Sequence, residues 1–135
     1  MSLMTWSNDY SVHIGLVDEQ HKKLVGLING LHDAMKKGKG KDVLGKTLSD
    51  LVDYTAYHFT QEEELFKTYA YPDYLPHKKE HDALKSQAVD LREQFTRGEL
   101  FLSNKTVLFL KNWLNGHILG SDKKYGPFLN AKGVS

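Results

Sequence analysis

The strongest constraint on the fold is a repeated spacing, because apolar or imidazole side chains recur every three or four residues along four separate segments. This is the period of an α-helix that turns one face towards a core. We therefore expect helices at about 18–37, 42–68, 73–97 (or 76–97) and 104–119. Their inward faces include Leu24, Ile28 and Leu31; Leu44, Leu48 and Leu51; Leu84, Ala88 and Leu91; and Leu110, Trp113 and Leu114. No run of residues alternates with a period of two, so no strand is predicted.

Residues that end or begin helices separate these segments. Gly38 and Gly98 follow predicted helix ends, and Ser103 is a suitable N-cap for the last helix. Pro72 indicates a turn, since proline lacks a donor and restricts the residue before it. Four amphipathic helices with short connections predict an all-α fold, an antiparallel up-down-up-down four-helix bundle with an N-terminal arm.

The chain of 135 residues fits a single domain. We expect an irregular arm at 1–17, the bundle at about 18–122 and a C-terminal tail at 123–135. Within the tail, Pro127 argues against a long helical continuation.

Seven histidines and no cysteine are the unusual part of the composition. The absence of cysteine excludes a disulfide scaffold, a thiolate zinc site, a cysteine nucleophile and a cysteine-ligated iron–sulfur cluster. A net charge of +1 argues against a nucleic-acid partner. No apolar run approaches the roughly 18 residues of a membrane span, so membrane insertion is not expected.

Five histidines and two carboxylates fall on inward helix faces, at helix ends that an antiparallel bundle brings together. The first and third helices begin at the end of the bundle where the second and fourth finish. We therefore predict that all seven side chains converge on one layer. As isolated core residues they would form a costly group of buried polar side chains, so a metal site is favoured over ordinary core histidines. These residues are His21, His58, Glu62, His77, His81, His117 and Asp122.

Asp122 follows His117 by five residues, which places the two about 140° apart on an ideal helix of about 100° per residue. Both can face inward only if the backbone departs from the α-helix between them. Gly120 makes such a departure inexpensive. We therefore predict a helix end or a π-type turn at about 118–122.

The number and type of donors indicate which metal would fit. Five nitrogens and two carboxylates are too many for one tetrahedral zinc and too rich in nitrogen for calcium or magnesium. Imidazole with carboxylate suits iron among other metals. Two metals bridged by the two carboxylates would use every group and leave one position open. Ferritin-like di-iron sites differ, because they use mostly glutamates with Glu-x-x-His pairs, which the inward faces here lack.

Four short motifs carry a specific resemblance. DEQHKKL around His21, HFTQEEE from His58, HKKEH from His77 and HILGSD from His117 are similar to the corresponding motifs of the hemerythrin family, in particular single-domain bacterial hemerythrins. The resemblance covers nearly the whole chain, including Trp6 in the arm and KYGPFL after the last motif. All seven positions that hold metal in that family have the expected residue type.

The resemblance implies a non-haem di-iron site in a four-helix bundle that binds O2 reversibly. By analogy, one iron is held by His77, His81 and His117, and the other is held by His21 and His58 with one position left open for O2. Glu62 and Asp122 would bridge the two irons, with a solvent-derived oxo or hydroxo group as the third bridge.

Five apolar residues lie within one helical turn of the predicted ligands and are candidates for a dry O2 pocket. An apolar pocket withholds protons and water from bound O2, although each of these residues also suits ordinary core packing. The candidates are Leu24, Leu84, Trp113, Leu114 and Ile118.

The remaining polar residues near these motifs receive simpler interpretations. Glu63 and Glu64 point away from Glu62 around the helix and are expected in solvent, with contacts to histidine Nδ1 atoms as an alternative for them. His32 is about 16 Å along the helix from His21, so we expect a histidine at the edge of the core. No role is assigned to His13.

Oxygen carriage, storage or delivery is the function favoured by these observations, and a catalytic role is not favoured because the expected pocket is apolar. Two alternatives stay open: a domain that senses O2 or redox state for a signalling partner, and a di-iron enzyme such as a peroxidase or a nitric-oxide-processing catalyst. O2 is the expected ligand. The start of the chain has no evident signal peptide, which together with the resemblance leads us to expect the bacterial cytoplasm.

Overall fold

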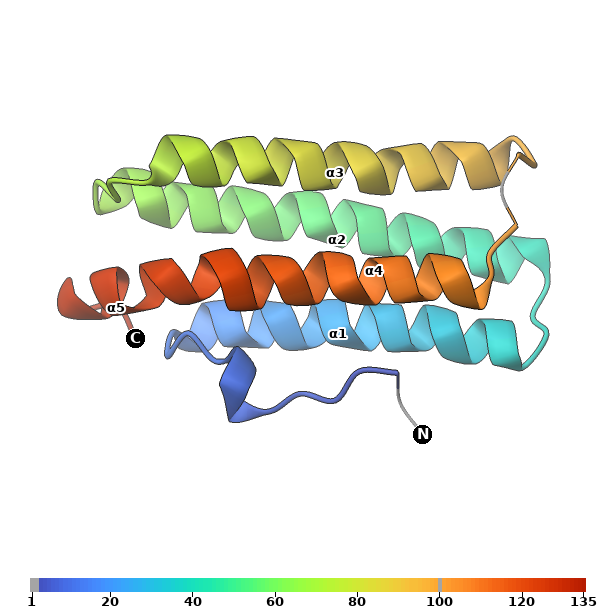
Figure 1. The fold of residues 1–135 in the computed structure, drawn as a ribbon, viewed down its shortest axis with the longest axis horizontal. Helices are drawn as coiled ribbons and strands as arrows, with labels where there is room; N and C mark the ends of the chain where they lie inside the picture. Colours follow the sequence, from blue (N-terminus) through green and yellow to red (C-terminus); the bar gives the residue numbers. More distant parts are fainter. Residues whose placement is uncertain (1–2, 100) are drawn as a thin grey trace.

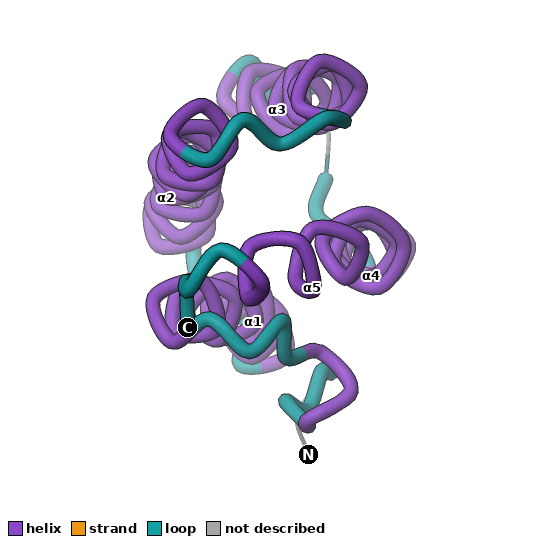
Figure 2. The backbone as a smooth tube through the Cα atoms, turned by 90° about the vertical axis from the view of Figure 1, so that its left-hand side faces the viewer, coloured by secondary structure: helices purple, strands orange, loops and turns teal. Residues whose placement is uncertain are grey.

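Four long helices form the molecule in the computed structural model, which describes residues 3–99 and 101–135. They are α1 (Gly15–Lys36), α2 (Lys41–Thr68), α3 (Tyr74–Thr96) and α4 (Asn104–His117), and they alternate in direction (Figure 1). Helix α1 packs against α2 and α4, α2 packs against α3, and the end view shows all four around one axis (Figure 2). The described residues contain no strand, so the predicted all-α four-helix bundle is confirmed.

Helix boundaries lie within three residues of the predictions, and the local chemistry explains them. Ser103 caps α4 by accepting a hydrogen bond from the Thr106 backbone N–H at 3.4 Å, as predicted. Gly38 and Gly98 follow α1 and α3 with φ angles of +67° and +76°, a conformation that glycine adopts without steric penalty.

The N-terminal arm is shorter than expected, because α1 begins at Gly15 and not at 18. Asp18 explains the early start: its carboxylate accepts hydrogen bonds from the Val12 N–H at 2.9 Å and the Ser11 hydroxyl at 2.5 Å. The described part of the arm contains a short 3-10 turn, η1 (Asn8–Tyr10), and residues 1–2 of the predicted arm lie outside the described residues.

The expectation that Pro127 would exclude a long helical continuation was wrong. After a π-helical turn, η2 (Ile118–Asp122), the chain continues as α5 (Lys123–Ala131) with Pro127 inside the helix. The proline removes only one backbone donor. Complete burial of Tyr125 and Leu129 outweighs that loss, since their side chains join an apolar cluster.

Two apolar clusters divide the interior. The larger one fills the bundle and includes Leu24, Ile28 and Leu110. The smaller one closes the end of the bundle and combines the arm, the end of α2 and α5 through Val12, Ile14, Val17, Phe66, Tyr71, Tyr125 and Leu129. Helix α5 therefore contributes to a cover over one end of the bundle.

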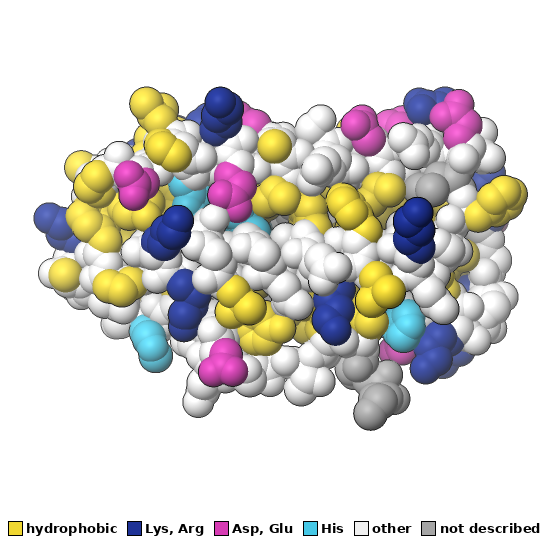
Figure 3. Space-filling model, in the orientation of Figure 1, with side chains coloured by type: hydrophobic (Ala, Val, Ile, Leu, Met, Phe, Trp, Pro, Cys, Tyr) yellow, Lys and Arg dark blue, Asp and Glu magenta, His cyan; other side chains and the backbone are white. Residues whose placement is uncertain are grey.

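On the face seen in Figure 3, positive and negative side chains are interspersed, so neither sign dominates there. Among the described residues, none of the helices combines the length and the apolar character needed to cross a membrane.

Candidate metal centre

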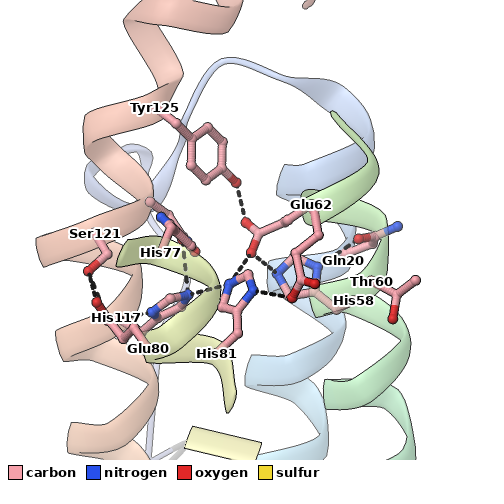
Figure 4. A network of polar contacts seen from close by, with 12 residues as sticks. Gln20, His58, Thr60, Glu62, His77, Glu80, His81, His117, Ser121 and Tyr125 are labelled. Atoms are coloured by element: carbon pink, nitrogen blue, oxygen red, sulfur yellow. Dashed lines mark hydrogen bonds and ion pairs between the residues drawn. The ribbon is translucent and has the colours of Figure 1, made fainter. Parts of the chain in front are cut away.

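The structure brings the seven polar side chains of the predicted layer together, between the two apolar clusters. Each of the seven is at most 5% exposed. The close-up in Figure 4 shows part of the layer, namely His58, Glu62, His77, His81 and His117, with several neighbours. The contributing elements are α1 for His21, α2 for His58 and Glu62, α3 for His77 and His81, α4 for His117, and η2 for Asp122.

The predicted π-type turn is present at Ile118–Asp122. The backbone N–H of Lys123 bonds back to the carbonyl of Ile118, five residues earlier. This wider turn compensates for the spacing of five between His117 and Asp122, and Asp122 is fully buried in the layer.

The seven side chains form two overlapping groups of donor atoms, within each of which all atoms lie within 4.8 Å of one another. One group contains three histidines, His77, His81 and His117, and the other contains two, His21 and His58. Glu62 and Asp122 belong to both groups. The arrangement therefore offers two adjacent positions for cations that share two carboxylates.

Asp122 faces both groups with different oxygen atoms. Its Oδ1 lies 3.0 Å from His77 Nε2 and 3.1 Å from His117 Nε2, whereas its Oδ2 lies 3.0 Å from His21 Nε2. Glu62 Oε1 lies between the groups, 3.0 Å from His81 Nε2 and 3.5 Å from His58 Nε2. All five histidines thus present Nε2 to the shared carboxylates.

The orientation of the rings suits metal binding better than hydrogen bonding. The Nε2 atoms of His21, His58 and His77 and both carboxylate oxygens of Asp122 have no hydrogen-bond partner among the described residues, despite their burial. His81 Nε2 and His117 Nε2 are 3.1 Å apart. In the metal-free protein the pKa of His117 is raised to about 10, so its Nε2 carries a proton that it can donate to His81 Nε2, and a bound cation would take the place of that proton. The donor set therefore fits bound metal.

Oxygen acceptors stand behind three of the histidines and favour the proton on Nδ1. His58 Nδ1 lies 2.6 Å from Gln20 Oε1, His81 Nδ1 lies 2.9 Å from Glu63 Oε2, and His117 Nδ1 lies 2.6 Å from Glu80 Oε1. Such contacts fix the orientation of a metal-binding ring and leave Nε2 free to bind.

Sequence reasoning found only part of this set of acceptors. For Glu63 the alternative interpretation, a contact with histidine Nδ1, is the correct one, while Glu64 lies in solvent beside Lys67. Gln20 and Glu80 were missed. Each directly precedes a predicted ligand in the sequence, at a position that looks like part of a polar helix surface. The partners come from other helices, so no spacing along one helix could indicate them.

Tyr125 is a further residue that the sequence analysis missed. Its hydroxyl donates a hydrogen bond to Glu62 Oε2, and the side chain is fully buried (Figure 4). Burial, together with the charges of Glu62 and Asp122, raises the pKa of Tyr125 well above its usual value. The hydroxyl therefore stays protonated and remains a donor to the carboxylate.

Burial and neighbouring charges shift the pKa values of the residues in the layer in opposite directions. Burial lowers the pKa of His58 to about 4, since Glu62 offsets this only in part. Burial also disfavours charge on His21 and His117, but neighbouring carboxylates prevail, chiefly Asp122, and raise their pKa values to about 9 and about 10. The pKa of Asp122 is held well below its usual value, because the nearby histidines outweigh its burial.

The apolar surroundings agree only partly with the predicted O2 pocket. A small hollow, too narrow to hold a water molecule, is lined by Phe59, Leu84, Trp113, Leu114 and His117. Three of the five predicted residues therefore line it, together with Phe59, whose ring stacks on that of His81 at 3.9 Å. Leu24 and Ile118 do not line this hollow and are packed in the larger apolar cluster.

Comparison with known proteins identifies the family. The family model for the hemerythrin HHE cation binding domain matches residues 12–129. The chain belongs to the hemerythrin family. This confirms the resemblance seen in the sequence motifs.

Relatives within the hemerythrin family cover nearly the whole chain. A bacteriohemerythrin from Methylococcus capsulatus is 39% identical over 97% of this chain and 100% of its own length. Another from Stenotrophomonas maltophilia is 32% identical over 97% of this chain and 84% of its own. A crystal structure of wild-type hemerythrin superposes with a TM-score of 0.88 at 38% identity, covering 93% of this chain and 97% of the other.

Proposed function

We propose that this member of the hemerythrin family binds O2 reversibly at a non-haem di-iron centre and serves in oxygen carriage, storage or delivery. The observation that carries the proposal is the pair of overlapping donor groups with two shared carboxylates. The family supports iron as the metal, and the absence of thiolate donors suits a site built from nitrogen and oxygen.

The ligands that we propose are the seven residues of the buried layer. Three histidines would hold one iron and two would hold the other, and Glu62 and Asp122 would bridge the pair with a solvent-derived oxo or hydroxo group. The group of three histidines would then offer five protein ligands and the group of two would offer four, so the position open for O2 would belong to the iron at His21 and His58. When bound, the iron pair supplies two electrons to O2 and recovers them on release.

The protein surroundings favour release of O2 over chemical reaction. Apolar side chains lie beside both donor groups: Leu24, one turn after His21 on α1, is buried in the larger apolar cluster, and Phe59, Leu84 and Leu114 line the hollow beside His117. The indole N–H of Trp113, which also lines it, donates to the backbone carbonyl of Leu84 at 3.2 Å and is therefore engaged. A dry, apolar surrounding slows protonation of bound O2 and its loss as peroxide. This argues for a carrier over a di-iron enzyme.

A spectroscopic titration tests the function. The iron content is measured first, and two irons per chain are required. The protein is then reduced under argon and exposed to O2, and we expect a visible charge-transfer absorption that disappears on deoxygenation and returns over repeated cycles. Irreversible oxidation with consumption of O2 would contradict a carrier and favour an enzyme or a sensor. One metal per chain would contradict the di-iron centre itself.

A further inference from the structure

The two donor groups differ in the residues that contact the Nδ1 atoms of their histidines. In the group of three, His81 and His117 place their Nδ1 atoms against the carboxylates of Glu63 and Glu80, at 2.9 Å and 2.6 Å. In the group of two, the acceptor behind His58 is the neutral amide of Gln20 at 2.6 Å. The remaining Nδ1 of that group, on the buried His21, has no partner among the described residues.

Both carboxylates are held in place by other contacts or by packing. Ser121 Oγ lies 2.8 Å and 2.7 Å from the two oxygens of Glu80, to which its hydroxyl donates. Ser121 belongs to the π-helical turn η2, so the turn that presents Asp122 to the layer also fixes Glu80. The side chain of Glu63 is 16% exposed and is therefore largely enclosed where it meets His81.

A carboxylate that accepts a hydrogen bond from histidine Nδ1 makes Nε2 a stronger electron donor to a metal. The reason is that the shared Nδ1 proton leaves more negative charge on the ring. A neutral amide orients the ring without adding charge. Stronger donation stabilises the higher charge of ferric iron more than that of ferrous iron. Solvent screens the charge of Glu80, whose side chain is 39% exposed, more than that of Glu63, which is 16% exposed.

We propose that Glu63 and Glu80 are positioning residues that make the two iron positions unequal, giving the position of His77, His81 and His117 the lower reduction potential. The proposal rests on the di-iron function proposed above. Starting from two ferric ions, an external one-electron donor then reduces the two-histidine position first and the three-histidine position second. Each step adds one electron, and the Nδ1 protons stay on their rings.

A potentiometric titration under argon tests this proposal without O2 activity as the readout. The iron-loaded protein is titrated with redox mediators at pH 7, and the two midpoint potentials are compared in the wild type, Glu80→Gln and Glu63→Gln. Each substitution keeps the shape of the side chain and removes its charge. Loss of a partner behind a ligand typically changes metal affinity by about 10–100-fold. A tenfold loss of preference for ferric iron raises the lower midpoint by about 59 mV for one electron.

Control variants separate this effect from a general change in charge. Glu64→Gln removes a carboxylate from the next position along α2, where the side chain is 64% exposed and pairs with Lys67 at 3.8 Å. We expect it to leave both midpoints unchanged. Glu80→Asp keeps the carboxylate and is expected to retain a larger separation of the midpoints than Glu80→Gln.

The outcomes are distinct. A rise of the lower midpoint in Glu80→Gln and Glu63→Gln, with the upper one nearly fixed, supports the proposal. Equal shifts of both midpoints, or an equal shift in Glu64→Gln, would overturn it. If Glu80→Gln loses iron, the test rests on Glu63→Gln, because Glu63 contacts a different histidine, His81. Failure of the wild type to hold two irons would instead refute the proposed di-iron function.

Discussion

Removal of the Tyr125 hydroxyl tests how the buried layer is stabilised. Tyr125 is fully buried and its hydroxyl donates to Glu62 Oε2, while the other close neighbour of that oxygen, His21 Nε2, is 3.6 Å away. Tyr125→Phe therefore leaves a buried carboxylate oxygen without a donor. A hydrogen bond to a charged group contributes about 1.5–3 kcal/mol, so we expect the metal-free protein to lose about 2–3 kcal/mol of unfolding free energy.

A second tyrosine of the same apolar cluster provides a matched control. Tyr71 is 8% exposed and its ring lies 5.0 Å from that of Phe66, but its hydroxyl makes no hydrogen bond among the described residues. Tyr71→Phe removes the same atom and is expected to cost less than about 0.5 kcal/mol.

The measurement is urea unfolding of the metal-free protein at pH 7, followed by circular dichroism, with both variants and the wild type. Expressed as melting temperature, the expected loss for Tyr125→Phe is about 7–11 °C for a chain of this size. Equal, small losses in both variants would refute the reasoning, because they would mean that Glu62 does not depend on this donor.

Three further predictions follow from the same geometry. His77→Ala is expected to abolish binding of at least one of the two irons, whereas His32→Ala, eleven residues beyond His21, keeps both; iron analysis of the purified variants decides this. In the metal-free protein the raised pKa values of His21 and His117, about 9 and about 10, provide stability that is fully present below pH 6.5 and lost as the pH rises through 9–10. Urea titrations between pH 6.5 and 10 should show this decline, and iron loading, which requires neutral imidazoles, should abolish it. Deletion of Leu119, which is 46% exposed, converts the spacing of five between His117 and Asp122 into the spacing of four of a regular helix. Two irons per chain are therefore expected to remain. Complete loss of iron would contradict this account of the turn.

Much of the fold could be predicted because local chemistry repeats in it. The four inward faces follow the helical period, Ser103 caps α4 as expected, and the helix boundaries lie within three residues of the predictions. The spacing of five between His117 and Asp122 required a wider turn, which is the π-helical turn observed. In each case the decisive information lies within a few residues of sequence.

Other features depend on contacts between distant segments and could not be predicted in this way. Pro127 is an unfavourable residue in a helix, yet α5 forms through it, because burial of Tyr125 and Leu129 against the arm and α2 outweighs one missing hydrogen bond. Gln20 and Glu80 look like ordinary polar residues until the bundle places them behind histidines of other helices.

The sequence by itself determined the bundle, the end of it where the histidines meet, and the seven residues of the layer. These follow from helical period, helix direction and the cost of burying unpaired polar groups. Only the tertiary structure decided how the seven divide into groups of three and two histidines around shared Glu62 and Asp122. It also decided which side chain stands behind each ring. Such pairings depend on the rotation of one helix against another, which packing fixes and local spacing does not encode.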